Sequence, residues 1–416
     1  MRSATVSALE PVRWLPARPA PRARDQPVPR GSLAFVLKIV SRCNLNCSYC
    51  YVYNKGDSTW RTRPVLMSDV VVDVAIDRII DWCRQSGQSR VHITFHGGEP
   101  LMAGRKRFDH WCRLIRSRLA GIAEVGFNVQ TNGTLLDERW ADVFLEHRVA
   151  VGVSIDGPPE IHDAVRVDHR GRGSHARIVR GIEVLRARDV PLGALAVLQF
   201  GADSLAIHRH ITALGFPNIN YLLPDFTHDT VGEIHRQYGP TPCADYLLPI
   251  FDDWWQNGTM DVRIPLFMAV ARLVMGGRSN IDMVGNEPFG FVFIEPDGAI
   301  EDLDALRVCR QGMAGTGLNV FANEVWDVAA LSPLHRAAMF DGLDTPRGCA
   351  GCPEQSTCSG GYLPHRWSSG SAFDNPSVWC ADLLKLFTHV RRCLDVDVEE
   401  TALRRQALAE MTCAAN

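Results

Sequence analysis

The sequence contains no long run of apolar residues and no strong excess of charge of either sign. No stretch reaches the ~18 consecutive apolar residues that suggest a membrane-spanning helix, so we expect no membrane association. The 44 lysines and arginines nearly balance the 47 aspartates and glutamates, and the net charge of −3 gives no support to nucleic-acid binding. A chain of 416 residues exceeds one typical core, so two or three domains are expected.

The N-terminal segment lacks the apolar region of a secretory signal. Residues 1–32 are rich in proline and arginine, which predicts a flexible tail, with a docking segment as the alternative. Without export, the 13 cysteines would lie in a reducing cytoplasm, where clustered cysteines more often bind metal than form disulfides. A cytoplasmic protein with metal sites is therefore expected.

From residue 33 onward, short apolar runs alternate with amphipathic segments. Ser68 has the position of an N-cap before the first amphipathic segment. Strands separated by helices predict parallel βαβ units with right-handed crossovers. The predicted fold class is α/β, with a partial (β/α)6 barrel over residues 33–237 that binds ligands at the C-terminal ends of its strands. The six candidate strands begin at Phe35, Val91, Val125, Val149, Leu192 and Ile219.

The pattern changes after residue 237. Residues 238–290 predict a helical bridge, and a hairpin that turns at Asp297-Gly298 is expected to follow. Residues 291–393 include the cysteine-rich stretch GCAGCPEQSTCSGGYLPHRW, which is too small to form a core without a metal. We predict a small α+β domain there, followed by a C-terminal helix or tail over residues 394–416.

The stretch SRCNLNCSYCYVYN, residues 41–54, carries three cysteines directly after the first predicted strand. Cys43, Cys47 and Cys50 have the spacing C-x3-C-x2-C. A closed zinc site takes four protein ligands, whereas three thiolates can hold three irons of a cubane cluster and leave the fourth iron open. A partial zinc site and thiols without a shared role are the alternatives.

A second group of cysteines lies near the C-terminus, with the spacing C-x2-C-x5-C-x21-C. Cys349, Cys352, Cys358 and Cys380 supply four thiolates, which would suit either zinc or one fully ligated iron–sulfur cluster. Other cysteines lie on predicted helices or near the terminus and are expected to be ordinary thiols: Cys83, Cys112, Cys393 and Cys413.

The three-cysteine loop resembles that of the radical S-adenosylmethionine (SAM) enzymes. Three further motifs, HGGEP from His96, QTNG from Gln130 and SIDG from Ser154, follow successive strands in the order that this family has. The resemblance implies that SAM chelates the open iron and yields a 5′-deoxyadenosyl radical. It assigns the cluster to Cys43, Cys47 and Cys50, and cofactor contacts to Tyr49, Gly97, Gly98, Glu99, Pro100, Asn132, Ser154, Asp156 and Arg166.

The second cysteine group resembles the SPASM domain of peptide-maturing relatives. Full SPASM domains carry seven cysteines and two auxiliary clusters, but Leu303 and Tyr362 occupy the places of two of these cysteines. Cys309 is a nearby remnant. The resemblance therefore implies one auxiliary 4Fe-4S cluster, held by Cys349, Cys352, Cys358 and Cys380.

Stretches such as FVLKIVSRCNLNCSYCYVYN and CSGGYLPHRW resemble the cyclophane-forming, FxsB-type radical SAM/SPASM maturases. This resemblance implies a ribosomal precursor peptide in which an aromatic ring carbon is joined to the β-carbon of a residue two positions later. It also implies an external electron donor such as flavodoxin or ferredoxin. A general base is expected among Asp225, Asp229 and Glu287, with Asp297, His228 and His365 as further candidates.

Three other functions remain open at this stage. Thioether formation and formylglycine-type sulfatase maturation are alternative radical SAM/SPASM reactions. The two missing SPASM cysteines argue mildly against the sulfatase maturases. A zinc-stabilised binding module is the more distant alternative.

Overall fold

The computed structural model describes residues 33–257, 261–279, 281–288, 290–328 and 333–414. The predicted tail, residues 1–32, lies outside the described residues. Among the helices in these ranges, none is both long and apolar enough to cross a membrane.

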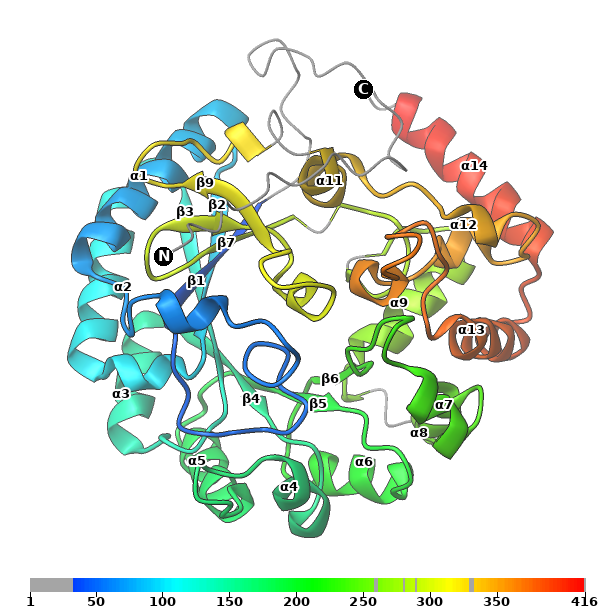
Figure 1. Cartoon of the computed structure of the whole chain (residues 1–416), viewed down its shortest axis with the longest axis horizontal. Helices are drawn as coiled ribbons and strands as arrows, with labels where there is room; N and C mark the ends of the chain where they lie inside the picture. The colour runs from blue at the N-terminus through cyan, green and yellow to red at the C-terminus, as the bar shows by residue number, and fades with distance from the viewer. Residues whose placement is uncertain (1–32, 258–260, 280, 289, 329–332, 415–416) are drawn as a thin grey trace, which may run out of the picture.

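A nine-stranded sheet forms the centre of the molecule, with the strand order β6-β5-β4-β3-β2-β1-β7-β8-β9 (Figure 1). Neighbouring strands from β1 to β6 pair in parallel. Each begins within one residue of its predicted start, so the α/β class and the partial parallel barrel are confirmed. The bounds are β1 Ala34–Val40, β2 Arg90–Gly97, β3 Glu124–Thr131, β4 Val149–Ser154, β5 Leu192–Val197 and β6 Ile219–Leu222.

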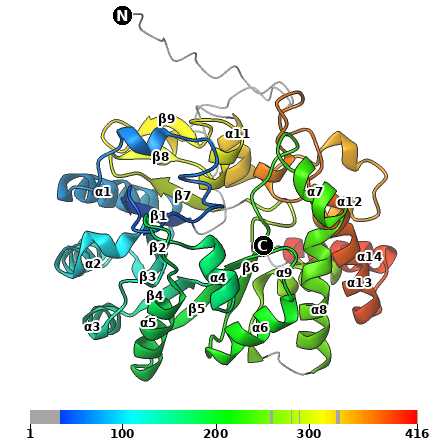
Figure 2. The same cartoon turned by 60° about the horizontal axis from the view of Figure 1, so that its bottom comes forward.

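Helices connect these strands and cover the outer face of the sheet (Figure 2). Ser68 caps the first one as predicted, because its side chain accepts a hydrogen bond from the backbone N of Val71. Two short helices, α4 and α7, were not predicted; each has only seven residues, too few for a helical repeat to stand out. The bounds are α1 Asp69–Ser86, α2 Arg105–Leu119, α3 Glu138–His147, α4 Pro159–Val165, α5 His175–Ala187, α6 Ser204–Ala213 and α7 Gly232–Tyr238.

The helical bridge and the C-terminal helices lie together on the opposite side of the molecule from α1, α2 and α3 (Figures 1 and 2). Helix α13 packs against both α8 and α9, so the end of the chain is joined to the bridge. The bounds are α8 Pro242–Gln256, α9 Pro265–Val274, α11 Pro333–Arg336, α12 Gln355–Cys358, α13 Cys380–Leu394 and α14 Val398–Ala414.

The predicted hairpin is present as β7 (Phe291–Ile294) and β8 (Ala299–Glu301), and β9 (Gly315–Asn319) follows it. Strand β7 pairs in parallel with β1, from Ala34 opposite Phe291 to Leu37 opposite Ile294. The cysteine-rich segment therefore begins as an extension of the barrel sheet. No sequence pattern indicated this pairing, and the domain boundaries proposed at residues 237/238 and 290/291 stay predictions.

Candidate active site

A cavity of ≈ 220 Å³ lies at the C-terminal ends of the barrel strands. Loops that follow β1, β2, β3, β4 and β6 form its wall, as the parallel topology requires. The three predicted cluster ligands, Cys43, Cys47 and Cys50, all line it as free thiols. So do seven of the residues assigned to the cofactor: Tyr49, Gly97, Gly98, Asn132, Ser154, Asp156 and Arg166.

The three-cysteine loop is fixed by neighbouring polar groups. Asn132 Nδ2 lies 3.6 Å from Cys43 Sγ and 2.8 Å from Asn44 Oδ1. Burial raises the pKa of the Cys43 thiol to about 12 and that of Cys50 to about 11. Such thiols ionise only beside positive charge, which cluster iron supplies. Three convergent thiols next to an open cavity therefore fit a cluster with one iron left for a cofactor.

The HGGEP loop packs directly against the cysteine loop. A Cβ atom at Gly98 would lie 2.1 Å from Tyr53 Oη and 2.2 Å from the Arg42 carbonyl oxygen, so the approach requires glycine. Glu99 is fully buried, and its carboxylate accepts hydrogen bonds from Thr131 Oγ1 (2.7 Å) and the Asn132 backbone N (2.8 Å). Glu99 thus joins the loops after β2 and β3. Neither Glu99 nor Pro100 is in the cavity wall, so their cofactor contacts stay predictions.

Tyr49, Asp156 and Arg166 form a hydrogen-bonded group in the wall, in which Asp156 and Arg166 are buried and Tyr49 is half-buried. The Tyr49 hydroxyl donates to Asp156 Oδ2 at 2.5 Å, and Arg166 Nη1 donates to the same hydroxyl at 2.5 Å. Burial raises the pKa of Asp156, although Arg166 opposes this shift. The sequence placed these three residues near a cofactor, but it did not indicate that they contact one another.

The three proposed bases occupy different environments. Asp225 lines the cavity, and its Oδ1 lies 3.4 Å from His365 Nε2. Asp229 accepts a hydrogen bond from the Ser369 backbone N at 2.9 Å and does not line the cavity. Glu287 Oε2 lies 3.6 Å from Arg278 Nη1, also away from the wall. The structure therefore brings Asp225 alone of the three to the predicted cofactor residues.

Two cavity residues were missed by the sequence analysis. The Lys55 ammonium lies 4.1 Å from the centre of the Phe226 ring, and both side chains line the cavity beside Asp225. Burial lowers the pKa of Lys55, although Asp225 opposes the shift. Lys55, from the loop after β1, thus places a cation beside the carboxylate and the aromatic ring of the loop after β6, and no local motif marks Lys55.

A buried charge network behind Tyr51 was also missed. Tyr51 lines the cavity, and its hydroxyl donates to Asp304 Oδ2 at 2.9 Å. Lys38 Nζ lies 2.8 Å from Asp304 Oδ1, and Arg307 Nε lies 2.7 Å from the same oxygen. Burial opposes ionisation of Asp304, but Lys38 and Arg307 outweigh it and hold the pKa of this carboxyl well below its usual range. One local signal existed: a lysine inside the apolar strand FVLKIV.

The four C-terminal thiols converge at a second, much smaller site. Cys349, Cys352, Cys358 and Cys380 line one small cavity together. Arg366 lies beside it, fully buried, and donates to the carbonyl oxygens of Ser359 (2.8 Å) and Gly361 (2.9 Å). Its positive charge opposes the rise that burial causes in the pKa of Cys358. Four thiols with a nearby buried cation fit a fully ligated cluster.

Apolar side chains occupy the region where the resemblance would place a second auxiliary cluster. Leu303 belongs to a buried cluster that includes Leu306 and Leu363, and both Cys309 and Tyr362 pack against it. Cys309 Sγ lies 3.7 Å from the Pro364 carbonyl oxygen, and burial raises the pKa of this thiol far above its usual range. These residues do not provide the donor set of a four-iron cluster.

Comparisons with known proteins agree with this geometry. The profile of the radical SAM superfamily matches residues 37–203. A cysteine-type anaerobic sulfatase-maturating enzyme of Clostridium perfringens is 28% identical over 271 residues, which cover 64% of this chain and 72% of that enzyme. An uncharacterized protein of Synechocystis is 31% identical over 376 residues, covering 83% of this chain and 87% of that protein.

A solved structure, native anSMEcpe with bound AdoMet and the Kp18Cys peptide, has the same fold. It superimposes with a TM-score of 0.74 at 21% sequence identity and covers 88% of this chain and 98% of that one. These comparisons favour the sulfatase-maturation alternative over the cyclophane branch, for which they give no support. They confirm the predicted cofactors, since the chain belongs to the radical SAM superfamily, whose members use S-adenosylmethionine and a 4Fe-4S cluster.

Proposed function

We propose that this protein is a maturase that oxidises the side-chain β-carbon of a residue within a peptide or protein substrate. The main support is the shared cavity, in which the three thiols and the Tyr49–Asp156–Arg166 group face the same space as Asp225 and Phe226. When bound, the cluster and SAM supply a 5′-deoxyadenosyl radical that removes a hydrogen atom from an unactivated carbon. The chain's own residues must then bind the substrate, exclude water and accept a proton.

The β-carbon has two possible outcomes. A serine side chain becomes an aldehyde when it loses one hydrogen atom, one proton and one electron. Similarity to a serine-type anaerobic sulfatase-maturating enzyme of Bacteroides thetaiotaomicron, 24% identical over 399 residues, favours this outcome. Alternatively, the β-carbon bonds to an aromatic ring carbon, and the ring then loses one proton and one electron. The apolar packing of Leu303, Cys309 and Tyr362 argues mildly against the first outcome, because it separates the chain from the seven-cysteine SPASM pattern.

Asp225 is the proposed proton acceptor in either outcome. It is the one of the three predicted bases that lies in the cavity wall, and a base has to come within hydrogen-bond reach of the proton that it removes. Tyr51 and Asp304 offer a second route, but Lys38 and Arg307 make the Asp304 carboxylate a weak base. The electron requires a one-electron acceptor, and the four-thiol site is where the chain could hold one.

Isotope transfer tests the oxidation of the β-carbon independently of its outcome. The reduced, reconstituted enzyme is incubated anaerobically with SAM and a synthetic peptide that contains serine and aromatic residues and carries deuterium on its β-carbons. We expect deuterium in 5′-deoxyadenosine and a peptide that has lost two hydrogens. Trapping by a hydrazide identifies the aldehyde, and resistance to the hydrazide identifies the crosslink. Deuterium that stays entirely in the peptide while product forms would refute the proposal.

A matched pair of variants tests the base. Asp225→Asn should retain SAM cleavage and deuterium transfer but form product at least about 100-fold more slowly, because general-base catalysis contributes roughly 10²–10⁴-fold. Asp229→Asn, four residues away and outside the cavity wall, should match the wild type. If Asp225→Asn formed product at the normal rate and Asp304→Asn formed none, the proton would instead leave through Tyr51 and Asp304.

A further inference from the structure

Helices α8 and α13 lie side by side and run in the same direction. At their N-terminal ends the Ala244 backbone N donates to Asp382 Oδ1 at 2.9 Å. Near their C-terminal ends, His389 Nε2 lies 2.6 Å from Asp252 Oδ1. Helix α13 begins at Cys380, a thiol of the four-cysteine site, so this pair of helices connects the site to the bridge.

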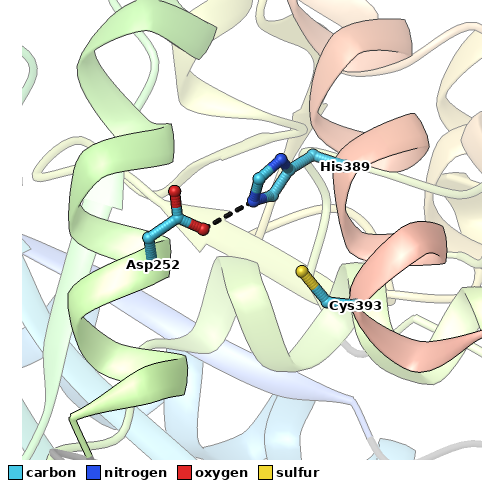
Figure 3. A group of neighbouring side chains, drawn as sticks. All are labelled: Asp252, His389 and Cys393. Carbon is cyan, nitrogen blue, oxygen red and sulfur yellow. Dashed lines mark hydrogen bonds and ion pairs between the residues drawn. The ribbon is translucent and has the colours of Figure 1, made fainter.

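A third potential ligand joins the second of these contacts. His389 and Cys393 are four residues apart on α13, which places them on one face of the helix. Ligand atoms of Asp252, His389 and Cys393 all lie within 4.8 Å of one another. Figure 3 shows the imidazole and the thiol of α13 projecting toward the α8 carboxylate. The His389 ring also packs edge-on against Phe251, with ring centres 5.6 Å apart, which restricts its orientation.

The electrostatics of this trio favour a cation. The trio lies in or next to the last turn of both helices, which end at Gln256 and Leu394, so the partial negative charge of each C-terminal end is nearby. Within the part of the chain that the structure describes, the one ion pair of Asp252 is with His389. Burial and the neighbouring Asp252 raise the pKa of the Cys393 thiol. A bound cation would neutralise the carboxylate and the ionised thiol together.

Two other clusters of potential ligands already contain basic side chains. Lys38 and Arg307 pair with the group formed by Glu295, Glu301 and Asp304. Arg113 pairs with the group formed by Asp109, Glu146 and His147. The described ion pairs give the Asp252 trio no lysine or arginine, so no long basic side chain takes the place of a metal ion there. The one basic partner of Asp252 among them is His389, which is itself a potential metal ligand.

We propose that Asp252, His389 and Cys393 bind a divalent metal, zinc by ligand type, and that this metal clamps α13 to α8. One thiolate, one imidazole and one carboxylate are ligands that zinc prefers, and water would complete a tetrahedral site. Nitrogen and oxygen ligands of a tetrahedral zinc are about 3.3 Å apart. The distance of 2.6 Å between His389 Nε2 and Asp252 Oδ1 must therefore lengthen slightly when zinc binds. The His389 and Asp252 side chains are 26% and 39% exposed, which leaves room for this adjustment.

Metal analysis of the holoenzyme tests the site. The protein is reconstituted anaerobically with its iron–sulfur clusters, treated with a mild chelator and titrated with zinc chloride, while zinc and iron per chain are both measured. We expect the wild type to bind one zinc without losing iron, and its thermal midpoint to rise. His389→Ala and Cys393→Ser should weaken zinc binding by at least about 100-fold, since loss of a residue that only supports a ligand costs 10–100-fold. Their iron content should stay at the wild-type level.

The matched control is Cys83→Ala on α1, which removes a buried thiol outside all three cysteine sites. It should bind zinc as the wild type does. The proposal is overturned if the wild type binds no zinc under these conditions. It is also overturned if His389→Ala and Cys393→Ser bind zinc as tightly as Cys83→Ala.

Discussion

The two cysteine sites of this protein differ in the space around their thiols. Cys43, Cys47 and Cys50 face a cavity of ≈ 220 Å³ whose wall also carries Tyr49, Asp156, Arg166 and Asp225. The four thiols from Cys349 to Cys380 instead converge on a small cavity beside the buried Arg366. An open coordination position is useful for chemistry only where a substrate or cofactor can reach it. We therefore propose that the first site is the reactive one and that the second holds its cluster with four protein thiolates.

Ligand removal should separate the two sites most strongly. Cys47→Ala should abolish SAM cleavage, because the first cluster cannot form without its third thiolate. Cys352→Ala should lose about half of the iron yet still cleave SAM when reduced. Iron, acid-labile sulfide and 5′-deoxyadenosine are measured after anaerobic reconstitution. Equal loss of SAM cleavage in both variants would contradict this division of roles. Cys112→Ala, in the core of the barrel, is the control and should keep both the iron content and SAM cleavage.

Replacing Arg366 is expected to have the next largest effect, and that effect should be confined to the four-thiol site. Arg366→Met leaves the carbonyl oxygens of Ser359 and Gly361 without this donor. Each buried acceptor that loses its hydrogen bond lowers the free energy of unfolding by about 1–3 kcal/mol. It also removes the positive charge beside Cys358. We expect weaker retention of the auxiliary cluster in a chelator challenge, with SAM cleavage unchanged. An unchanged rate of iron loss would show that Arg366 has no influence on the cluster.

Tyr49→Phe probes the wall of the open site. The substitution removes the hydroxyl that contacts both Asp156 and Arg166, each at 2.5 Å. A hydrogen bond to a charged group contributes about 1.5–3 kcal/mol, so SAM should bind about 10–100-fold more weakly if this group positions it. Calorimetric titration of the reconstituted enzyme measures this constant. Tyr238→Phe, which lies outside the cavity wall, should bind SAM normally.

The smallest predicted effect is a pH dependence of the free energy of unfolding, which arises at His162 beside the three-cysteine cavity. His162 Nδ1 accepts a hydrogen bond from the Asp156 backbone N at 3.2 Å, so this ring is neutral. Burial, together with Arg166 and two neighbouring histidines, lowers the pKa of His162 to about 2. In the unfolded chain this pKa is about 6.5, so between these values the unfolded state binds the extra proton. The free energy of unfolding should therefore fall as the pH drops below about 6.5.

Between pH 7 and 5.5 the contribution of His162 amounts to about 1 kcal/mol. His162→Gln should reduce the pH dependence by that amount in denaturant titrations at the two pH values. His335→Gln, in the cysteine-rich segment, provides a comparison from outside the open site. A steeper pH dependence in His162→Gln would show that the ring is charged in the folded state.

Local patterns were sufficient for the barrel. Apolar runs of five to eight residues separated by amphipathic helices predict parallel strands, because a sheet covered by helices requires apolar strands. The four C-terminal thiols, spread over 32 positions, were also grouped correctly into one cavity. The short helices α4 and α7 carry too few turns to produce a periodic signal.

Contacts between distant parts of the chain could not be predicted in this way. Lys38 and Asp304 are 266 residues apart, and nothing near either residue identifies the other. The same holds for the pairing of β7 with β1, which depends on an available sheet edge rather than on a sequence pattern. The comparisons, and not the motifs, moved the expected reaction from crosslinking toward sulfatase-type maturation.

The sequence by itself determined the order of the six barrel strands and of the five longer helices between them, and it singled out the seven thiols of the two cysteine sites, because both follow from spacing along the chain. Only the tertiary structure decided which polar residues share the cavity wall: it placed Asp225 and Lys55 there and left Glu99, Asp229 and Glu287 outside. The distance between two residues along the chain does not show whether they will be neighbours in the cavity wall. They are set by how loops at the same edge of a parallel sheet converge once the strands have paired.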